Sequence, residues 1–379
     1  MRPARRRDAT NGITGRRRVL INAIHAKSGG GVTHLRGLLP LLADMDDLDI
    51  HMVLSSGQEA LLAEPMPAGV VLHRLNLPAA MIPLLVWEQV RLPALARRLG
   101  ADVVFCPANY GPLALRRQVV TLTNALAVGK SETRLGKRLY WTVLGLLTRA
   151  SLWRAQAAIA VSAYVAEDIC PPALRHKVTV IPHGVAPFFH PDPAVAREDF
   201  VLAVSDIYIQ KNLHVLVEAF AALAADHGGL HLRIAGRIID SDYHRRLLAL
   251  VAGRGLGERV HFLGHCDRVR IRHLYRSCRL FVFPSTVESF GMPVLEAMAC
   301  AAPVVCSNTT AMPEVAGPAA VLFDPASAEA LGAALVALLA DGPRRAALGQ
   351  AGQARAARFT WQRAAEATAT VLRKAMRPD

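Results

Sequence analysis

The segment Leu280-Phe-Val-Phe-Pro-Ser-Thr-Val-Glu288-Ser-Phe290-Gly291-Met292-Pro-Val-Leu-Glu296 carries the clearest structural signal in this 379-residue chain. The four apolar residues at its start predict a short buried strand of a parallel sheet. A polar loop follows, and a helix is expected from near Met292. Pro293 fits the first turn of that helix, where amide groups have no helical partner. The segment therefore predicts a strand, loop and helix unit of an α/β fold.

The helix start after Gly291 suits a phosphate group. Free N–H groups and the positive end of the helix dipole point out of the sheet there, and a glycine lets an anion approach the main chain closely. Glu288 in the loop and Glu296 in the helix flank this point. Carboxylates do not bind phosphates, but they accept hydrogen bonds from hydroxyl groups such as those of a sugar and a ribose. The local chemistry predicts a nucleotide sugar as ligand.

The pattern Glu288-x7-Glu296, with Phe290-Gly291 between the two glutamates, resembles the signature of the retaining glycosyltransferases of family 4. This family is also described as the glycosyl transferases group 1 set. The alternative is a solvated loop glutamate together with a first-turn glutamate that the helix dipole favours. The resemblance covers most of the chain from about Val19 onward. It implies an α/β fold of two Rossmann-like domains (GT-B type) with a cleft between them, and a C-terminal helix that packs back on the first domain.

Length and composition agree with two domains of ordinary size, because the chain has 379 residues and is 52% hydrophobic. We expect a basic disordered tail, an N-terminal Rossmann-like acceptor domain, a Pro/Asp-rich linker, a C-terminal nucleotide-sugar domain and a returning helix. The expected bounds of these five parts are 1–18, 19–185, 186–199, 200–358 and 359–379.

The formal net charge is +14, and seven arginines against one aspartate in residues 1–18 contribute +6 of it. A basic surface suits nucleic acid or an anionic membrane. The membrane is favoured, and nucleic acid is not expected as a partner, because no nucleic-acid motif with interleaved aromatic residues is present. Residues 130–154 form a basic amphipathic stretch. Such a stretch fits an anionic membrane surface and an ordinary packed surface helix equally well.

The six cysteines show neither CxxC pairs nor zinc spacing, which indicates core residues in a reducing cytoplasm. No apolar run is long enough for a membrane span, and no signal peptide is recognisable. We therefore expect a cytoplasmic protein, with the inner face of the cell membrane as a peripheral location.

A glycine-rich turn, Ser28-Gly29-Gly30-Gly31, is expected between a first strand over Val19–Ile24 and a helix over Val32–Ala43. Such a turn binds phosphate or allows a close approach of the main chain. By resemblance, Gly30 and Gly31 line the cleft beside the donor phosphates and the acceptor. The alternative is a tight turn that packs a helix on a strand.

In the second domain, Lys211 matches the lysine with which the resembled family binds the donor diphosphate. Asp206 stands where the family has an arginine, so a pair of cations is not expected there. Arg237, directly after the next strand, either replaces the missing charge or is an ordinary exposed arginine. Cys266 lies in a stretch that resembles the loop against which the nucleotide base rests.

Thr123-Asn124 follows a predicted strand at the point where many family members have a His-Asp pair. Threonine and asparagine form hydrogen bonds but do not titrate, so an acid–base role cannot be transferred to them. His25, at the end of the first strand, occupies similar space or is a structural histidine. The triplets Asp47-Leu-Asp49 and Asp240-Ser-Asp242 are expected to be a turn and a helix cap rather than metal ligands.

The predicted activity is transfer of a hexosyl group (mannosyl, glucosyl, rhamnosyl or similar) from a UDP- or GDP-sugar to a glycan or lipid-linked acceptor in cell-surface polysaccharide synthesis. No metal or further cofactor is expected. The predicted catalytic residues are Lys211, Glu288, Thr123 and Asn124. The predicted donor-binding residues are Gly30, Gly31, Lys211, Arg237, Cys266, Glu288, Phe290, Gly291, Met292 and Glu296. By resemblance Glu296 holds the ribose, Glu288 holds the donor sugar, and the reaction retains configuration at the anomeric carbon. A GT-B epimerase or phosphorylase, a non-catalytic nucleotide-sugar-binding protein and a nucleic-acid binder remain as alternatives.

Overall fold

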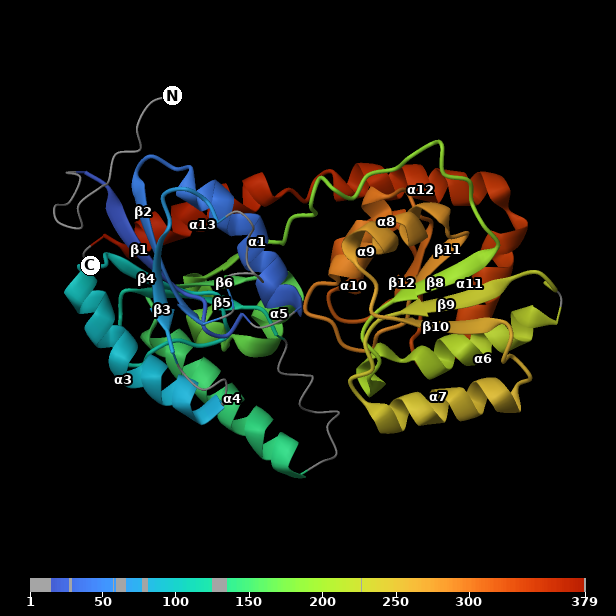
Figure 1. Cartoon of the computed structure of the whole chain (residues 1–379), viewed down its shortest axis with the longest axis horizontal. Helices are drawn as coiled ribbons and strands as arrows, with labels where there is room; N and C mark the ends of the chain where they lie inside the picture. Colours follow the sequence, from blue (N-terminus) through green and yellow to red (C-terminus); the bar gives the residue numbers. More distant parts are fainter. Residues whose placement is uncertain are drawn as a thin grey trace.

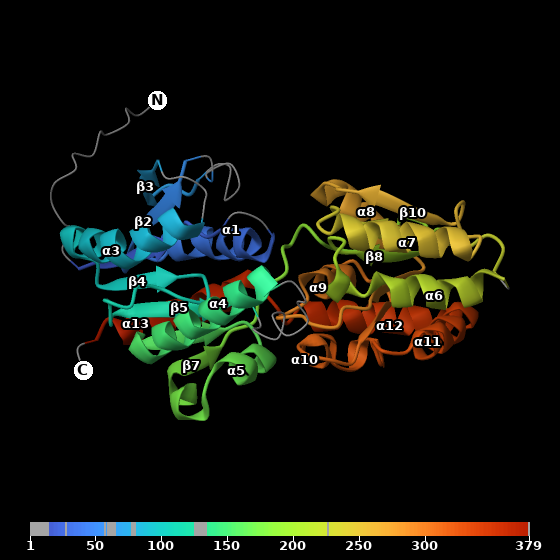
Figure 2. The ribbon, with the colours of Figure 1, turned by 90° about the horizontal axis from the view of Figure 1, so that it is seen from below.

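The computed structural model describes residues 15–26, 29–56, 58, 66–76, 81–124, 135–225 and 227–377. In these ranges the chain forms two α/β domains that lie side by side along the long axis of the molecule (Figure 1 and Figure 2). None of the helices found there is long and apolar enough to cross a bilayer. The predicted two-domain α/β architecture is confirmed.

The first domain is built on a seven-stranded parallel sheet in the order β3-β2-β1-β4-β5-β6-β7. Its strands are β1 (Arg17–Asn22), β2 (Leu48–Ser55), β3 (Val71–Leu75), β4 (Val103–Cys106), β5 (Gln118–Leu122), β6 (Ala157–Ala160) and β7 (Val178–Val180). Its helices are α1 (Gly29–Ala43), α3 (Met81–Leu99), α4 (Leu135–Arg154), α5 (Ala163–Ile169) and the 3-10 helix η2 (Pro172–Lys177).

Both faces of this sheet are covered, as expected for a parallel sheet made of continuous apolar runs. Side chains alternate between the two faces along each strand. Val19 accordingly packs in one core cluster with Leu35 of α1. Leu20 packs in the opposite cluster with Leu92 of α3 and Leu152 of α4.

The second domain repeats this plan on a six-stranded parallel sheet in the order β10-β9-β8-β11-β12-β13. Its strands are β8 (Phe200–Val204), β9 (His231–Ala235), β10 (Val260–Gly264), β11 (Leu280–Phe283), β12 (Val304–Ser307) and β13 (Val321–Phe323). Its helices are η3 (Ile209–Lys211), α6 (Leu213–Ala224), α7 (Ser241–Gly253), α8 (Arg268–Ser277), α9 (Met292–Ala299), α10 (Met312–Ala316), η4 (Gly317–Ala319), α11 (Ala328–Ala340) and α12 (Gly342–Ala356).

The last helix, α13 (Trp361–Ala375), returns to the first domain and lies against α1 (Figure 1). Trp361 and Leu372 belong to the same core cluster as Leu35. Arg373 holds the far end of the helix, because its guanidinium group donates to both carboxylate oxygens of Asp47 at 2.7 Å. The predicted return of the C-terminal helix is thus confirmed.

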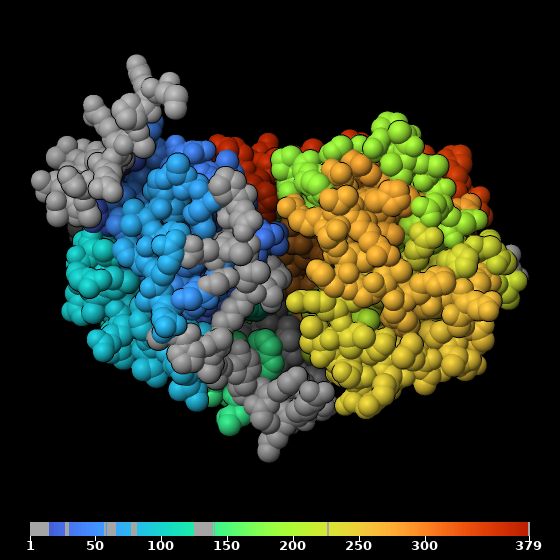
Figure 3. Space-filling model, viewed as in Figure 1, coloured from blue at the N-terminus to red at the C-terminus, as the bar shows by residue number. Residues whose placement is uncertain are grey.

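The carboxyl edges of the two sheets face each other. Ser162, just after β6, donates its hydroxyl hydrogen bond to the carbonyl oxygen of Ser289 in the second domain at 2.7 Å. The N–H of Ala163 donates to the Glu314 carboxylate of α10 at 2.8 Å. On the face seen in Figure 3 the molecular surface is hollowed between the two domains. This is the predicted cleft.

In each sheet the order in which strands are added reverses once. In the first sheet, β2 and β3 are added on one side of β1, and β4 is then added on the other side. The second sheet does the same between β8 and β11. In open parallel sheets, ligands bind outside the carboxyl ends of the strands at such a switch point. The residues that follow β1, β4, β8 and β11 are therefore the first candidates for a functional site.

Two local boundaries differ from the expectation. The first strand begins at Arg17 and ends at Asn22, so Arg17 and Arg18 belong to the sheet rather than to a disordered tail. The reason is tertiary, since Arg18 bonds to Asp49 at 2.7 Å. Helix α1 begins at Gly29, so the glycines form its first turn, where their low helix propensity costs little because few helical hydrogen bonds exist yet.

Candidate functional site

The switch point of the second sheet holds an ion pair between Lys211 and Glu288. Lys211 ends the η3 turn that follows β8, and Glu288 lies in the loop that follows β11. The Lys211 ammonium group donates a hydrogen bond to Oε1 of Glu288, and the two side chains are 12% and 14% exposed. The fold thus brings together two predicted site residues that are distant in sequence.

The surroundings of Lys211 keep it charged. Burial by itself lowers the pKa of this ammonium group. Charge interactions and hydrogen bonds with the Glu288 carboxylate and Tyr208 raise the pKa by more than burial lowers it, so the pKa of Lys211 lies above its ordinary value. Its nitrogen also lies 5.3 Å from the ring centroid of Phe283. Lys211 is therefore a permanent cation in a largely enclosed position.

Glu288 is held by two further hydrogen bonds. The Ser285 hydroxyl donates to its carboxylate at 2.6 Å, and its own N–H donates to the Thr310 hydroxyl at 3.1 Å. Because Lys211 of η3, Ser285 after β11 and Thr310 before α10 all bond to this residue, the carboxylate has a defined position before any ligand binds.

Gly291 caps α9 in a conformation that requires glycine. Its φ is +92°, and a Cβ atom would lie 2.3 Å from the terminal methyl group of Met312. The Phe290 ring packs between the two domains. Its centroid lies 5.0 Å from that of the His183 ring and 6.1 Å from that of the Phe359 ring. The partly buried Met292 packs against core clusters of both domains. The predicted phosphate position at the start of α9 therefore lies where the domains meet.

Glu296, one turn into α9, has an unusual carboxyl group. Burial raises its pKa from 4.5 to about 7, and a hydrogen bond from the Tyr275 hydroxyl at 3.3 Å opposes this shift only in part. Ionising this buried carboxyl group costs free energy. A ligand that donates hydrogen bonds to the carboxylate stabilises the ionised form.

Arg237 pairs with Asp206, the residue at the family's arginine position. The guanidinium group donates to Oδ2 of Asp206 at 2.7 Å, and the Arg237 N–H donates to Oδ1 at 3.0 Å. Asp206 and Arg237 thus neutralise each other after β8 and β9. The buried Cys266 follows β10, with its thiol 3.8 Å from the Gly264 carbonyl oxygen.

In the first domain, Thr123 and Asn124 follow β5 and are bound by Asn109. Oδ1 of Asn109 accepts the N–H groups of Thr123 and Asn124 at 2.8 and 3.0 Å, and its amide donates to the Asn124 carbonyl oxygen at 2.6 Å. The two residues lie at the carboxyl edge of the sheet. In the described part of the chain no hydrogen bond joins them to Lys211 or Glu288.

The glycines at the start of α1 are open to an approaching ligand. A Cβ atom on Gly30 would meet no described atom within 4 Å, and one on Gly31 would meet only the Ala26 backbone at 3.8 Å. Packing against neighbours therefore does not explain these glycines. Ser28 lies outside the described residues.

Both aspartate triplets have structural roles. Asp240 caps α7, because its carboxylate accepts the N–H groups of Asp242 and Tyr243. Asp47 binds Arg373 of α13, and Asp49 binds Arg18 of β1. Among the residues with described positions, no group of three or more His, Cys, Asp and Glu side chains is arranged to hold a metal ion.

At the switch point of the first sheet, His25 was singled out from the sequence, but its pairing with Glu88 was missed. His25, three residues after β1, lies 3.0 Å from a carboxylate oxygen of Glu88, and Asn22 donates to the other oxygen at 2.6 Å. The only signal for Glu88 in the sequence was a single carboxylate within the largely apolar segment that forms α3. Periodicity alone cannot say which partner such a residue meets.

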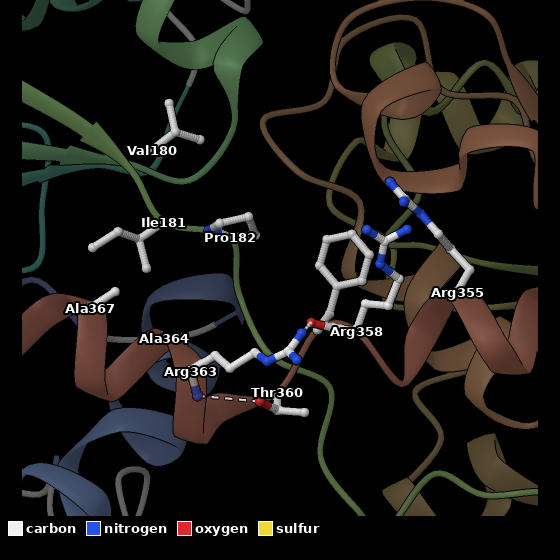
Figure 4. Close-up of a pocket in the computed structure, with 10 residues that line it drawn as sticks. Val180, Ile181, Pro182, Arg355, Arg358, Thr360, Arg363, Ala364 and Ala367 are labelled. Atoms are coloured by element: carbon white, nitrogen blue, oxygen red, sulfur yellow. Dashed lines mark hydrogen bonds between the residues drawn. The ribbon is translucent and has the colours of Figure 1, made fainter.

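A separate pocket of about 340 Å³ lies where the chain crosses between the domains (Figure 4). Val180, Ile181 and Pro182 lie on one side of it in the first domain, and Arg355 lies on the other side in α12. Its lining also includes Arg358, Phe359, Thr360, Arg363, Ala364 and Ala367. None of the predicted site residues lines this pocket.

Two family models match the chain in sequence. The family described as Glycosyltransferase Family 4 matches residues 28–187, and the family described as Glycosyl transferases group 1 matches residues 188–355. Each match covers one of the two domains.

Among curated relatives, the O-antigen chain mannosyltransferase B of Escherichia coli is 33% identical over 172 residues, which are 44% of this chain and 44% of that protein. The match thus spans less than half the length of that relative. Among solved structures, sucrose-phosphate synthase of Thermosynechococcus elongatus has a TM-score of 0.77 at 21% identity, covering 94% of this chain and 98% of that chain. The Anabaena HepE protein in complex with UDP and glucose has a TM-score of 0.75 at 20% identity, covering 94% and 99%. These two structures share the fold of this chain.

Proposed function

Because this chain belongs to the family 4 glycosyltransferases (glycosyl transferases group 1), we propose that it is a retaining, metal-independent hexosyltransferase. It takes a hexosyl group from a UDP- or GDP-sugar and passes it to a hydroxyl group of a glycan or lipid-linked acceptor in cell-surface polysaccharide synthesis. Mannose is the first candidate sugar, since the Escherichia coli relative is named a mannosyltransferase.

The observation that carries this proposal is the Lys211–Glu288 pair beside the start of α9. Glycosyl transfer builds positive charge on the sugar ring and negative charge on the departing diphosphate. Groups already aimed at the developing charge usually provide the largest catalytic contribution. A buried permanent cation and the N–H groups near Phe290, Gly291 and Met292 supply such groups for the diphosphate. The Glu288 carboxylate accepts hydrogen bonds from the sugar.

The remaining donor contacts are assigned by resemblance to the family. Glu296 accepts hydrogen bonds from the ribose, Cys266 lies by the base, and Gly30 and Gly31 face the phosphates from the first domain. Arg237 is also assigned to the donor side, with its charge offset by Asp206. Thr123 and Asn124 are assigned to hydrogen bonds with the reacting groups. The structural engagement of both aspartate triplets supports charge neutralisation by protein groups rather than by a bound cation.

Peripheral contact with an anionic membrane belongs to the same proposal, because a lipid-linked acceptor is delivered there. Helices α3 and α4 expose apolar side chains at helical spacing, with Trp153 65% and Leu146 62% exposed. The exposed Arg149 lies between them. This combination of apolar and basic side chains is typical of surfaces that lie on anionic bilayers. Lys130 and Arg134 of the predicted basic stretch lie outside the described residues.

The first experiment is a thermal-shift screen with UDP, GDP, UDP-glucose and GDP-mannose, followed by transfer to octyl mannoside with and without EDTA. We expect one nucleotide series to stabilise the protein, and turnover to survive EDTA. Lys211→Ala should cost about 3–4 kcal/mol of transition-state stabilisation, comparable to the loss of one oxyanion donor. Lys211→Gln should recover little, because a neutral amide does not replace a charge.

Lys374→Ala, which removes an exposed lysine of α13, is the matched control and should behave like the wild type. Activity that EDTA abolishes and magnesium restores, together with a nearly normal Lys211→Ala variant, would contradict the assignment. Analysis of the anomeric configuration of the product by NMR tests retention separately.

A further inference from the structure

The pocket shown in Figure 4 lies where two segments that cross between the domains run side by side. The first crossing is residues 181–199, between β7 and β8, and the second is residues 357–360, between α12 and α13. The N–H of Val185 donates to the carbonyl oxygen of Phe359 at 2.9 Å. A Cβ atom on Gly184 would lie 2.5 Å from a backbone carbon of the second crossing, so this close approach requires glycine. The proposed transfer mechanism uses none of the residues that line the pocket.

The charges around this pocket have one sign. Among the described residues that line it, three are arginines and none is acidic. Arg355 comes from α12, Arg358 from the second crossing and Arg363 from α13. Burial lowers the pKa of the Arg355 guanidinium, the nearby charge of Arg358 lowers it further, and the charge of Glu314 opposes this in part. An anion between Arg355 and Arg358 would replace their mutual repulsion with attraction.

The guanidinium groups still have donors to offer. Arg355 donates from Nε to the Val315 carbonyl oxygen at 3.0 Å and from Nη2 to the Glu314 carbonyl oxygen at 2.6 Å, which holds the group in place. Arg363 donates to the Arg358 carbonyl oxygen at 3.1 Å. Within the described ranges, neither Nη1 of Arg355 nor the side chain of the exposed Arg358 has a hydrogen-bond or ion-pair partner. These groups can therefore bind an anion without breaking an existing bond.

The rest of the lining is mostly apolar. Ile181 is 6% exposed, and Pro182 and Ala364 also line the pocket. The guanidinium carbon of Arg355 lies 5.1 Å from the centroid of the Phe359 ring. With a volume of about 340 Å³, the pocket is at the small end of the range for ligand sites. These dimensions fit a compact organic group with one charged end.

We propose that this pocket is a second binding site, separate from the donor cleft, for a small organic phosphate monoester. The phosphate lies between Arg355 and Arg358, and the organic group lies on the apolar lining. A phosphate monoester is favoured over a carboxylate because it carries a charge of about −1.5 to −2 at pH 7 and three oxygens that accept hydrogen bonds. Guanidinium groups bind such oxygens through two parallel hydrogen bonds. The site does not depend on the proposed function, since it shares no residue with the donor cleft.

Isothermal titration calorimetry with phenyl phosphate and with inorganic phosphate tests the site. We expect phenyl phosphate to bind at least about tenfold more tightly, because its ring covers apolar lining that inorganic phosphate leaves exposed. Arg358→Ala should weaken the binding of phenyl phosphate about 10- to 100-fold, the usual range for a hydrogen bond to a charged group. Arg358→Lys should recover only part of the affinity, because the charge remains but the fork of donors is lost.

The controls separate this pocket from other positions where a phosphate binds. Arg344→Gln, which changes an exposed arginine of α12 outside the pocket, should leave the Kd unchanged within about twofold. Lys211→Ala and saturating UDP or GDP should also leave it unchanged, because the donor cleft is a different site. Hydrogen exchange with mass spectrometry locates the ligand. Phenyl phosphate should slow exchange in segments 181–186 and 355–364 and not around Lys211.

The same ligand chemistry occurs in a dissolved phosphate monoester and in the headgroup of phosphatidic acid. Sedimentation with phosphatidylcholine vesicles, with and without phosphatidic acid, distinguishes these two sources. Equal sedimentation of Arg358→Ala and the wild type with both kinds of vesicle would indicate a dissolved ligand. An increase with phosphatidic acid that Arg358→Ala removes would indicate the lipid headgroup.

No binding of phenyl phosphate would overturn the proposal, as would binding that is unchanged in Arg358→Ala and in the charge reversal Arg358→Glu. Displacement of phenyl phosphate by UDP or GDP would also overturn it, because the ligand would then lie in the donor cleft. Failure of the proposed function looks different, since the wild-type protein would then bind phenyl phosphate in this pocket but neither bind a nucleotide sugar nor transfer from one.

Discussion

Glu296 shows how one residue can combine a stability cost with a binding role. In the free protein its carboxyl group is enclosed beside Tyr275, and burial raises its pKa to about 7. The folded protein therefore binds a proton more tightly than the unfolded chain between pH 4.5 and 7. The resulting stabilisation is present below pH 4.5 and is lost as the pH rises through 7. Ribose hydroxyl groups would favour the ionised form, because they donate hydrogen bonds to it.

We predict that nucleotide affinity rises between pH 6 and pH 8, and that Glu296→Gln removes this dependence. Over the range from pH 4.5 to 8, the free energy of unfolding of the free protein should fall by about 1–3 kcal/mol through this group. Calorimetric titration with the nucleotide and urea unfolding, each at several pH values, measure the two effects. A pH dependence of affinity that persists in Glu296→Gln would assign the titration to another group.

At the scale of elements, α3 and α4 stand out because their outer sides are apolar. Ile82, Val86 and Val90 are exposed at spacings of four along α3, and Leu146 and Trp153 are exposed on α4. Residues four apart lie on one side of a helix. The inner sides of both helices pack in the core, so these outer apolar side chains are not buried by the fold.

We predict that the protein sediments with phosphatidylglycerol vesicles and much less with phosphatidylcholine vesicles. The double change Leu146→Ser and Trp153→Ser should weaken vesicle binding by at least about tenfold, because each buried CH₂ group contributes about 0.8 kcal/mol. Transfer to a soluble acceptor should be unchanged. Val336→Ser, which alters an exposed apolar residue of α11 in the second domain, is the matched control. Equal binding of the double variant and the wild type would contradict a membrane role for this face.

At the scale of the whole molecule, the two domains meet around a pair of buried histidines. Nδ1 of His34 in α1 lies 3.1 Å from Nδ1 of His183 in the segment that leaves the first domain. The His183 ring contacts Phe290 of the second domain and Trp361 of α13. Burial lowers the pKa of His34 to about 4, and burial together with His34 lowers that of His183 well below its usual range. Both rings are therefore neutral when the junction is intact.

We predict that acid weakens this junction. A histidine with a folded pKa of about 4 contributes stability that is present above pH 6.5 and is lost as the pH falls through 4. For His34 the loss amounts to about 3 kcal/mol. Urea unfolding measures the free energy of unfolding at pH 7 and at pH 4.5. The difference between these two free energies should be smaller for His34→Gln than for the wild type, whereas His176→Gln, at an exposed histidine of the same domain, should leave the difference unchanged. The same pH difference in His34→Gln and the wild type would show that His34 does not carry this effect.

Much of the architecture could be predicted from local patterns. The apolar run at Leu280–Phe283 and the helix from Met292 were predicted closely, because a buried parallel strand and a proline-tolerant helix start depend on neighbouring residues alone. The cap at Asp240 was predicted for the same reason. The two domains and the returning helix followed from the resemblance of these motifs to a known family.

Pairing between distant residues was decided only by the tertiary structure. Glu88 lies 63 positions from His25 in sequence, and Lys211 lies 77 from Glu288, so no local pattern relates them. Lys211 and Glu288 meet because β8 and β11, which are not consecutive in the chain, are neighbours in the second sheet. Glu88 reaches His25 because α3 packs on one face of the first sheet. The pairing of Arg237 with Asp206 and the burial that sets the pKa of Glu296 arise in the same way, since charge interactions and desolvation depend on distance in space rather than on position in the chain.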